Sequence, residues 1–203
     1  KHLVYASSSS VYGANTKLPF SVLDRVEKPL SLYAATKRSV ELMSYAYSHL
    51  FEFPQTGLRF FTVYGPWGRP DMAAAIFTQK ILQGEAIPIF NNGDMRRNFT
   101  YIDDIVSGII GCLYRPPAPK NNDVPVQVYN IGNDRSEFLL DFVDQIENAL
   151  GMKSEKNFLP MQAGDIKETV ADIDPAKEDF GFHPKTPIAD GIPRFVKWFR
   201  DYY

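Results

Sequence analysis

Residues 3–13 read Leu3-Val4-Tyr5-Ala6-Ser7-Ser8-Ser9-Ser10-Val11-Tyr12-Gly13, and the fold of this chain can be worked out from them. The first four residues form a short apolar, β-prone run that ends abruptly in small hydroxyl residues. This pattern is typical of a buried parallel strand at its carboxyl end. Ligands of open α/β sheets bind outside the carboxyl ends of strands, so a site is expected at the serines.

A second motif follows downstream, where Tyr33 precedes Lys37 by four positions. Ser31 predicts the start of a helix over residues 31–51, and such a helix stacks positions 33 and 37 on one face. An ammonium beside a phenol favours the phenolate, the form that a general base needs. The chain has 11 tyrosines, however, so the spacing alone fits an exposed amphipathic helix face equally well.

The remaining sequence alternates strand and helix patterns. Strands are expected over 2–6, 57–64 and 126–131. Helices are expected over 72–83 and 102–114, from a cap at Ser136 to Gly151, and over 189–202. A small hairpin is expected from residue 87 onward, and a surface loop over 116–123. Alternation of this kind predicts an α/β fold with a parallel sheet.

Composition describes an ordinary globular chain of 203 residues, 44% hydrophobic and 23% charged. The net charge of −2 and the scattered basic residues give no reason to expect nucleic-acid binding. The longest apolar stretch is interrupted by Ser107 and Gly108 and is too short for a bilayer, so no membrane partner is expected. A single cysteine, Cys112, cannot form an internal disulfide, which fits a cytoplasmic location. The three histidines show no metal-ligand spacing.

Several motifs together resemble the extended short-chain dehydrogenase/reductases, specifically the NAD-dependent nucleotide-sugar epimerases. The motifs are the serine-rich strand end, Tyr33-Ala34-Ala35-Thr36-Lys37, and the segments 58–66, 97–105 and 128–132. The segments 65–72 and 191–199 resemble the UDP-glucuronate 4-epimerase branch in particular. The resemblance covers essentially the whole chain.

This resemblance implies the carboxyl-terminal part of a Rossmann-type parallel sheet plus a smaller α/β substrate-binding domain. Residues 1–65, with a strand over 126–132, are expected to be the remaining half of the dinucleotide-binding domain, and residues 66–203 mostly the UDP-sugar domain. No Gly-x-Gly-x-x-Gly or Gly-x-x-Gly-x-x-Gly occurs, although the family carries this fingerprint on its first strand. We therefore expect the chain to be the carboxyl-terminal part of such an enzyme, with an incomplete NAD site.

The resemblance also assigns roles to individual residues. Ser8, Tyr33 and Lys37 are implied as catalytic; Ser7, Tyr33, Lys37 and Phe60 as cofactor-binding; and Ser9, Ser10, Thr62, Arg69, Arg97 and Asp165 as substrate-binding. A guanidinium suits phosphate or carboxylate, although a lone loop arginine is usually only solvated. Two departures from the family pattern are Asn98, where an aspartate is usual, and Ala163, where a proline is usual.

Serine at positions 9 and 10 distinguishes between reactions within the family. Dehydratases carry acidic residues there and sugar-acid decarboxylases a glutamate at the second position, and a serine cannot replace those acids. The implied activity is C4 epimerisation of a UDP-sugar, UDP-glucuronate to UDP-galacturonate, by a homodimer that carries NAD, with this chain alone inactive. The open alternatives are a UDP-hexose 4-epimerase, a uronate decarboxylase and a non-catalytic sugar-nucleotide-binding remnant.

Overall fold

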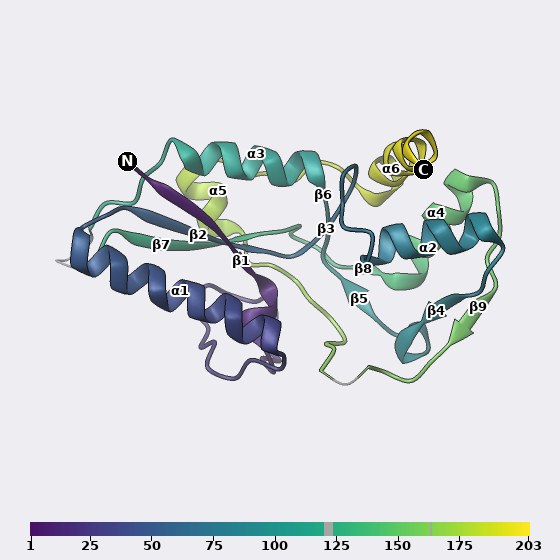
Figure 1. The fold of residues 1–203 in the computed structure, drawn as a ribbon, viewed down its shortest axis with the longest axis horizontal. Coiled ribbons are helices and arrows are strands. Elements are labelled where there is room, and N and C mark those ends of the chain that lie inside the picture. The colour runs from purple at the N-terminus through teal and green to yellow at the C-terminus, as the bar shows by residue number, and fades with distance from the viewer. Residues whose placement is uncertain (120–123, 163) are drawn as a thin grey trace.

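The computed structural model describes residues 1–119, 124–162 and 164–203, so part of the expected loop over 116–123 and Ala163 lie outside the described residues. The elements form two groups that lie side by side along the molecule (Figure 1). One group holds a parallel sheet between helices. The other is built from helices and short strand pairs.

The sheet consists of β1 (Leu3–Ser8), β2 (Gln55–Phe60) and β7 (Val126–Ile131), all parallel and in the order β1-β2-β7. Its register places Ser8, Phe60 and Ile131 side by side, so all three carboxyl ends meet at one edge. Helix α1 (Leu32–Phe51) covers one face, and α3 (Ile102–Leu113) and α5 (Asp174–Phe180) cover the other (Figure 1). The predicted α/β class with a parallel sheet is confirmed.

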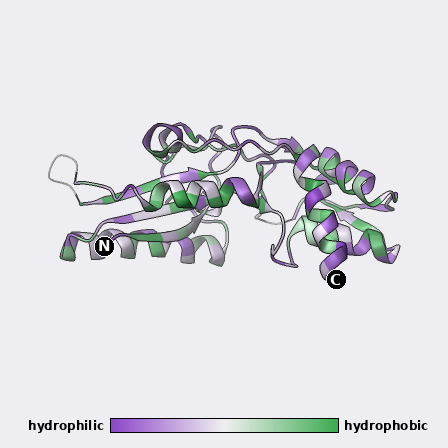
Figure 2. Cartoon of the chain, turned by 90° about the horizontal axis from the view of Figure 1, so that it is seen from above, coloured by the Kyte–Doolittle hydropathy of each residue, from purple (hydrophilic) through white to green (hydrophobic). Residues whose placement is uncertain are grey.

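Local signals explain where several helices begin and end. Ser31 has extended backbone angles, and its hydroxyl accepts the Ala34 N–H at 3.1 Å, so it caps α1 as predicted. Gly84 and Gly151 end α2 (Ala73–Gln83) and α4 (Leu139–Leu150) in the left-handed conformation. Hydrophobic and hydrophilic residues alternate along the helices (Figure 2), as expected for helices that bury only one side.

The second group lies toward the carboxyl terminus. Its remaining elements are β3 (Thr62–Tyr64), which pairs in parallel with β6 (Phe99–Tyr101), then β4 (Ile87–Ile89), β5 (Arg96–Arg97), β8 (Glu137–Phe138), β9 (Lys156–Phe158) and α6 (Ile188–Tyr202), with the short 3-10 helix η2 (Phe90–Gly93). The 3-10 helix η1 (Ser9–Tyr12) continues β1 and belongs to the first group, since its Val11 and Tyr12 are buried in the sheet core. Helices α2, α4 and α6 lie together at this end of the molecule (Figure 1).

The predicted hairpin after residue 87 is wrong. Strand β4 pairs in parallel with β9, and β5 pairs antiparallel with β8, so each strand finds its partner far along the chain. A local turn does form, since Asn91 and Asn92 both have φ of 50°. It connects strands of different sheets, and Ile87 and Ile89 on β4 are fully buried in the core formed by α2, α4 and α6.

Two further expectations need correction. The strand expected over 57–64 is broken at Phe61, because β2 belongs to the central sheet and β3 pairs with β6. Ser136 does not cap α4, whose N-cap is Phe138. The Ser136 hydroxyl instead donates to Glu168 at 2.8 Å, since β8 intervenes between the serine and the helix.

Two hydrophobic cores hold the groups together. One is centred on α2, α4 and α6, and the other on the sheet. The sheet core also takes in Ile105 and Cys112 of α3 and residues 171–182. The division into residues 1–65 with 126–132 and residues 66–203 stays a prediction, but packing adds these later segments to the first group.

A buried ion pair joins α1 to the central strand. Arg59 of β2 donates from Nε and Nη2 to the two carboxylate oxygens of Glu41, both at 2.9 Å. Ser7 donates to the same carboxylate at 2.6 Å and Arg38 at 2.9 Å. Burial by itself raises the pKa of Glu41, but the bonds and charge of Arg59, with those of Ser7 and Arg38, lower it overall.

We predict that Glu41→Gln lowers the free energy of unfolding by about 3–5 kcal/mol, because it leaves a buried guanidinium without its counter-charge. Since the pKa of Glu41 is lowered in the folded state, this stability is present above the unfolded pKa near 4.5 and is lost as pH falls through the folded value. Urea unfolding at several pH values should therefore show a smaller loss of stability in acid for the variant than for the parent chain.

The exposed Lys80–Glu85 pair supplies the matched control. Glu85→Gln should cost no more than about 1 kcal/mol, because exposed ion pairs contribute little. Equal losses of unfolding free energy in the two variants would show that the buried Glu41–Arg59 pair contributes no more than an exposed ion pair.

Candidate functional site

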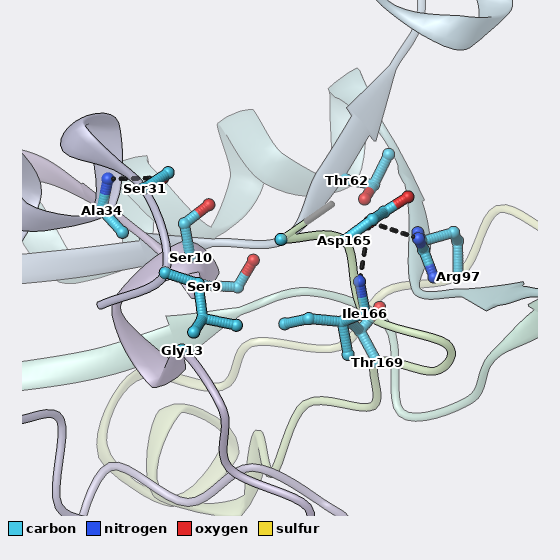
Figure 3. Close-up of a pocket in the computed structure, with 12 residues that line it drawn as sticks. Ser9, Ser10, Gly13, Ser31, Ala34, Thr62, Arg97, Asp165, Ile166 and Thr169 are labelled. Atoms are coloured by element: carbon cyan, nitrogen blue, oxygen red, sulfur yellow. Dashed lines mark hydrogen bonds and ion pairs between the residues drawn. The ribbon is translucent and has the colours of Figure 1, made fainter. Parts of the chain in front are cut away.

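A cavity of about 190 Å³ opens between the two groups at the carboxyl edge of the sheet. Its walls come from η1, the start of α1, β3, Arg97 and a segment near residue 165, and Figure 3 shows their side chains around one space. Five of the predicted substrate-binding residues line it: Ser9, Ser10, Thr62, Arg97 and Asp165. Leu30, Ser31, Ile166 and Thr169 line the cavity too, and sequence reasoning missed them.

The serines at the strand end have different surroundings. Ser8 caps η1: its Oγ accepts the Ser10 N–H at 3.1 Å and donates to Ser10 Oγ at 3.2 Å. Ser7 is buried, and its hydroxyl is bound to Glu41. The hydroxyls of Ser9 and Ser10 lie on the cavity wall. The turn that carries the two cavity serines is thus held by the hydrogen bonds between Ser8 and Ser10.

Arg97 and Asp165 form the opposite wall. Arg97 Nη2 donates to Asp165 Oδ1 at 2.8 Å (Figure 3). Arg97 Nη1 donates to the carbonyl oxygens of Arg96 and Lys167, both at 3.1 Å. Asp165 Oδ1 also accepts the Ile166 N–H at 2.8 Å. Burial lowers the pKa of Arg97, and Asp165 opposes that shift. The guanidinium is therefore held in place and partly desolvated, which strengthens its attraction for an anion.

Asn98 follows Arg97, where we expected a departure from the family pattern. The residue is fully buried. Its amide nitrogen donates to the carbonyl oxygens of Asn133 and Arg135, and its oxygen accepts the Asn133 N–H at 2.7 Å. An aspartate carboxylate cannot donate the first two bonds. Asparagine thus suits this environment, and it ties the strand that carries Arg97 to the loop after β7.

Tyr33 and Lys37 lie next to the cavity but do not line it. They project from α1, with Lys37 Nζ 5.8 Å from the centre of the Tyr33 ring and 3.1 Å from the Ala6 carbonyl oxygen. Tyr33 is 48% exposed. The ammonium thus lies between the helix and strand β1, beside the phenol, as the motif predicted. Phe60 ends β2 and is half-buried against the sheet core, away from the cavity lining.

Arg69 is the one predicted substrate-binding residue outside the cavity. It lies in the loop after β3 and forms an ion pair with Asp71. The pKa of Arg69 is raised, chiefly by its hydrogen bond to Asp71 and with a smaller contribution from Tyr33. Its guanidinium is exposed and shares a neighbouring hollow with Phe61 and Trp67.

Sequence reasoning missed the network beneath the site. The Arg59 guanidinium lies 4.9 Å from the centre of the Tyr12 ring, Tyr12 donates to Asn130, and Asn130 donates to the Phe20 carbonyl oxygen at 2.7 Å. Burial raises the pKa of Tyr12, so its hydroxyl remains a donor. A charged Arg59 between Leu58 and Phe60 in a buried strand was the signal in the sequence.

A sequence profile described as the NAD dependent epimerase/dehydratase family matches residues 1–132. The chain belongs to this family. The matched part contains the sheet, the serine turn and the Tyr33–Lys37 helix, which were the motifs that carried the predicted resemblance. The parallel sheet with helices on both faces is of the Rossmann type, which agrees with membership of this family.

Proteins that are similar to this chain over its whole length include UDP-glucuronate 4-epimerases. Protein CapI of Staphylococcus aureus is 51% identical over all of this chain, and a probable UDP-glucuronate 4-epimerase of Rhizobium meliloti is 44% identical, also over all of it. UDP-glucuronic acid 4-epimerase from Bacillus cereus, solved with UDP-glucuronic acid and NAD, superposes over the whole chain with a TM-score of 0.88 and 35% identity. The chain spans 64%, 63% and 62% of these three proteins, respectively.

Among the residues that the structure describes, no helix has the length and apolar character needed to cross a membrane. No group of three or more His, Cys, Asp or Glu residues in that part of the chain could hold a metal ion.

Proposed function

We propose that this chain provides the substrate-binding part and the catalytic base of an NAD-dependent UDP-glucuronate 4-epimerase. The observation that carries the proposal is that Ser9, Ser10 and Thr62 bring three hydroxyl side chains into the cavity that Arg97 also lines, while the Asp165 carboxylate of the same cavity is ion-paired with Arg97. The similarity to UDP-glucuronate 4-epimerases supports it. We call the polypeptide in which a glycine-rich cofactor-binding half precedes this chain the complete enzyme.

Different residues of this chain take different parts in substrate binding and catalysis, according to their chemistry. Arg97 binds the diphosphate, since a held guanidinium suits phosphate oxygens. Ser9, Ser10 and Thr62 hold the C6 carboxylate of the sugar by hydrogen bonds, which a carboxylate must have once it leaves water. Tyr33 takes the proton from the C4 hydroxyl as C4 is oxidised to the ketone and later returns it, while Ser8 donates a hydrogen bond to the same oxygen.

The cofactor implied by the family is NAD, which supplies the hydride acceptor when bound. The donors present fit part of it: the Lys37 ammonium uses one hydrogen bond on the Ala6 carbonyl and keeps two N–H groups for the hydroxyls of a ribose. Lys37 also places a positive charge beside the Tyr33 ring, with its Nζ 5.8 Å from the ring centre. Ser7 and Phe60 support the cofactor site from the same edge of the sheet. The Ser7 hydroxyl is already used in a hydrogen bond to Glu41.

The location and assembly of the complete enzyme are also proposals. One buried cysteine, with no disulfide, supports a cytoplasmic location. A homodimer is supported by the apolar side chains that α1 exposes, among them Leu42, Met43 and Leu50.

We expect Tyr33→Phe in the complete enzyme to lower turnover at least ~1000-fold, because it removes the base and almost no packing. Binding of UDP-glucuronate, measured by calorimetry, should change less than about threefold. Tyr47→Phe, which alters an exposed tyrosine further along α1, is the matched control and should keep full activity. A parallel loss of binding and turnover in Tyr33→Phe would make Tyr33 structural instead.

We also expect the complete enzyme to convert UDP-glucuronate at least ~100-fold more efficiently than UDP-glucose, because the hydroxyl wall matches the carboxylate. Chromatography of the products should show UDP-galacturonate with little pentose. Ser10→Ala or Thr62→Ala should raise the pentose fraction, since a less firmly held carboxylate leaves the 4-keto sugar as carbon dioxide more readily. Comparable rates on UDP-glucose would favour the hexose epimerase, and pentose as the main product the decarboxylase.

The 203-residue chain by itself should associate with itself, because α1 and the edge of β1 expose apolar groups and unpaired backbone. Sedimentation velocity over a wide concentration range measures this. A single monomeric species at every concentration would contradict the expectation.

A further inference from the structure

The loop that carries Arg69 begins with an unusual turn. Residues Gly65-Pro66-Trp67-Gly68 form a β-turn closed by the Gly68 N–H to the Gly65 carbonyl oxygen at 3.2 Å. Proline stands at the second position, where its fixed φ fits. Trp67 stands at the third with φ of 63°, a left-handed value at which glycine or asparagine is the rule and a bulky residue is an outlier.

Burial does not account for this tryptophan, since Trp67 is 74% exposed. Its ring instead packs on helix α6, with its centre 5.5 Å from that of Trp198 and 4.9 Å from that of Tyr202 in an edge-to-face arrangement. Trp198 and Tyr202 are themselves stacked, with centres 5.3 Å apart. The aromatic contacts therefore offset the backbone strain and fasten the turn to the last helix of the chain.

Arg69 follows this turn directly and begins a second one, in which the Met72 N–H donates to the Arg69 carbonyl oxygen at 3.2 Å. Its backbone is thus fixed on both sides, while its side chain is 68% exposed and bonded only to the equally exposed Asp71 among the described residues. A hollow of about 270 Å³ is lined by Arg69 and Trp67 together with Phe61, the neighbour of Thr62. The guanidinium is therefore on a fixed backbone, next to the strand whose Thr62 faces the cavity.

We propose that Trp67 is a positioning residue for substrate specificity: by clamping the turn to Trp198 and Tyr202 of α6, it holds Arg69 where the guanidinium meets the carboxylate of an acidic sugar. The inference rests on the proposed function, because it takes the carboxylated substrate from there. Substrate without a carboxylate gains nothing from Arg69, so the clamp acts on one substrate class only.

The test compares UDP-glucuronate and UDP-glucose in the complete enzyme. Trp67→Gly keeps the turn, since glycine prefers its φ, but removes the clamp. It should lower kcat/KM for UDP-glucuronate about tenfold, mainly through KM, and change kcat/KM for UDP-glucose less than about twofold. Arg69→Ala should do at least as much, and the double variant no more than Arg69→Ala, because Trp67 acts through Arg69. Trp67→Phe should restore most of the selectivity.

Tyr203→Ala is the matched control, because Tyr203 contacts Trp198 and Tyr202 but makes no ring contact with Trp67, and it should keep the parent selectivity. The clamp is also visible without turnover: Trp67 and Trp198 are the only two tryptophans of the sequence, so the 203-residue chain should show a coupled tryptophan pair in circular dichroism that Trp67→Phe abolishes. Absence of that signal in the parent chain would overturn the clamp.

Kinetic outcomes separate this inference from the function it rests on. A parent enzyme that does not prefer UDP-glucuronate defeats the proposed function, and the inference with it. A parent enzyme that prefers it, with a Trp67→Gly variant that prefers it equally, defeats the inference alone. Equal losses on both substrates, or losses that add in the double variant, would also overturn it, because they make Trp67 a structural residue.

Discussion

The ion pair between Glu41 and Arg59 is the constraint on which the rest of the structure depends. It is bidentate and almost wholly removed from water, and Ser7 adds a further bond to the same carboxylate. Two buried charges are tolerable only together, because each alone would face an uncompensated desolvation cost of several kcal/mol. The pair therefore fixes how α1 lies across β1 and β2. The position of α1 in turn sets where all of its side chains lie.

That constraint determines the geometry at the edge of the sheet. Ser7 leads into the turn that holds Ser9 and Ser10, and α1 carries Tyr33 and Lys37 beside the same strand end. On its other side Arg59 lies against Tyr12, whose bond to Asn130 ties η1 to β7. A polar network under the site thus supports a row of small hydroxyl groups above it, and rigid support of this kind is what a binding site for a flexible sugar needs.

The second group of elements completes the cavity from the far side. Arg97 and Asp165 are 68 positions apart in sequence, and their ion pair closes the wall opposite the serines. Asn98, bonded to the loop after β7, keeps that wall in register with the sheet. The cavity lies between two separately packed cores, as is common for ligand sites, so each wall is held by its own interior.

The sequence by itself determined the parallel sheet, the helix begun by Ser31, and five of the residues that line the cavity, because strand ends, caps and family motifs are local patterns. These five are Ser9, Ser10, Thr62, Arg97 and Asp165. Only tertiary structure decided that β4 pairs with β9 rather than with its neighbour, since burial of Ile87 and Ile89 outweighs a local turn. It alone joined Arg59 to Glu41 and Trp67 to α6. Such contacts depend on packing energy between distant segments, which no local pattern in the sequence encodes.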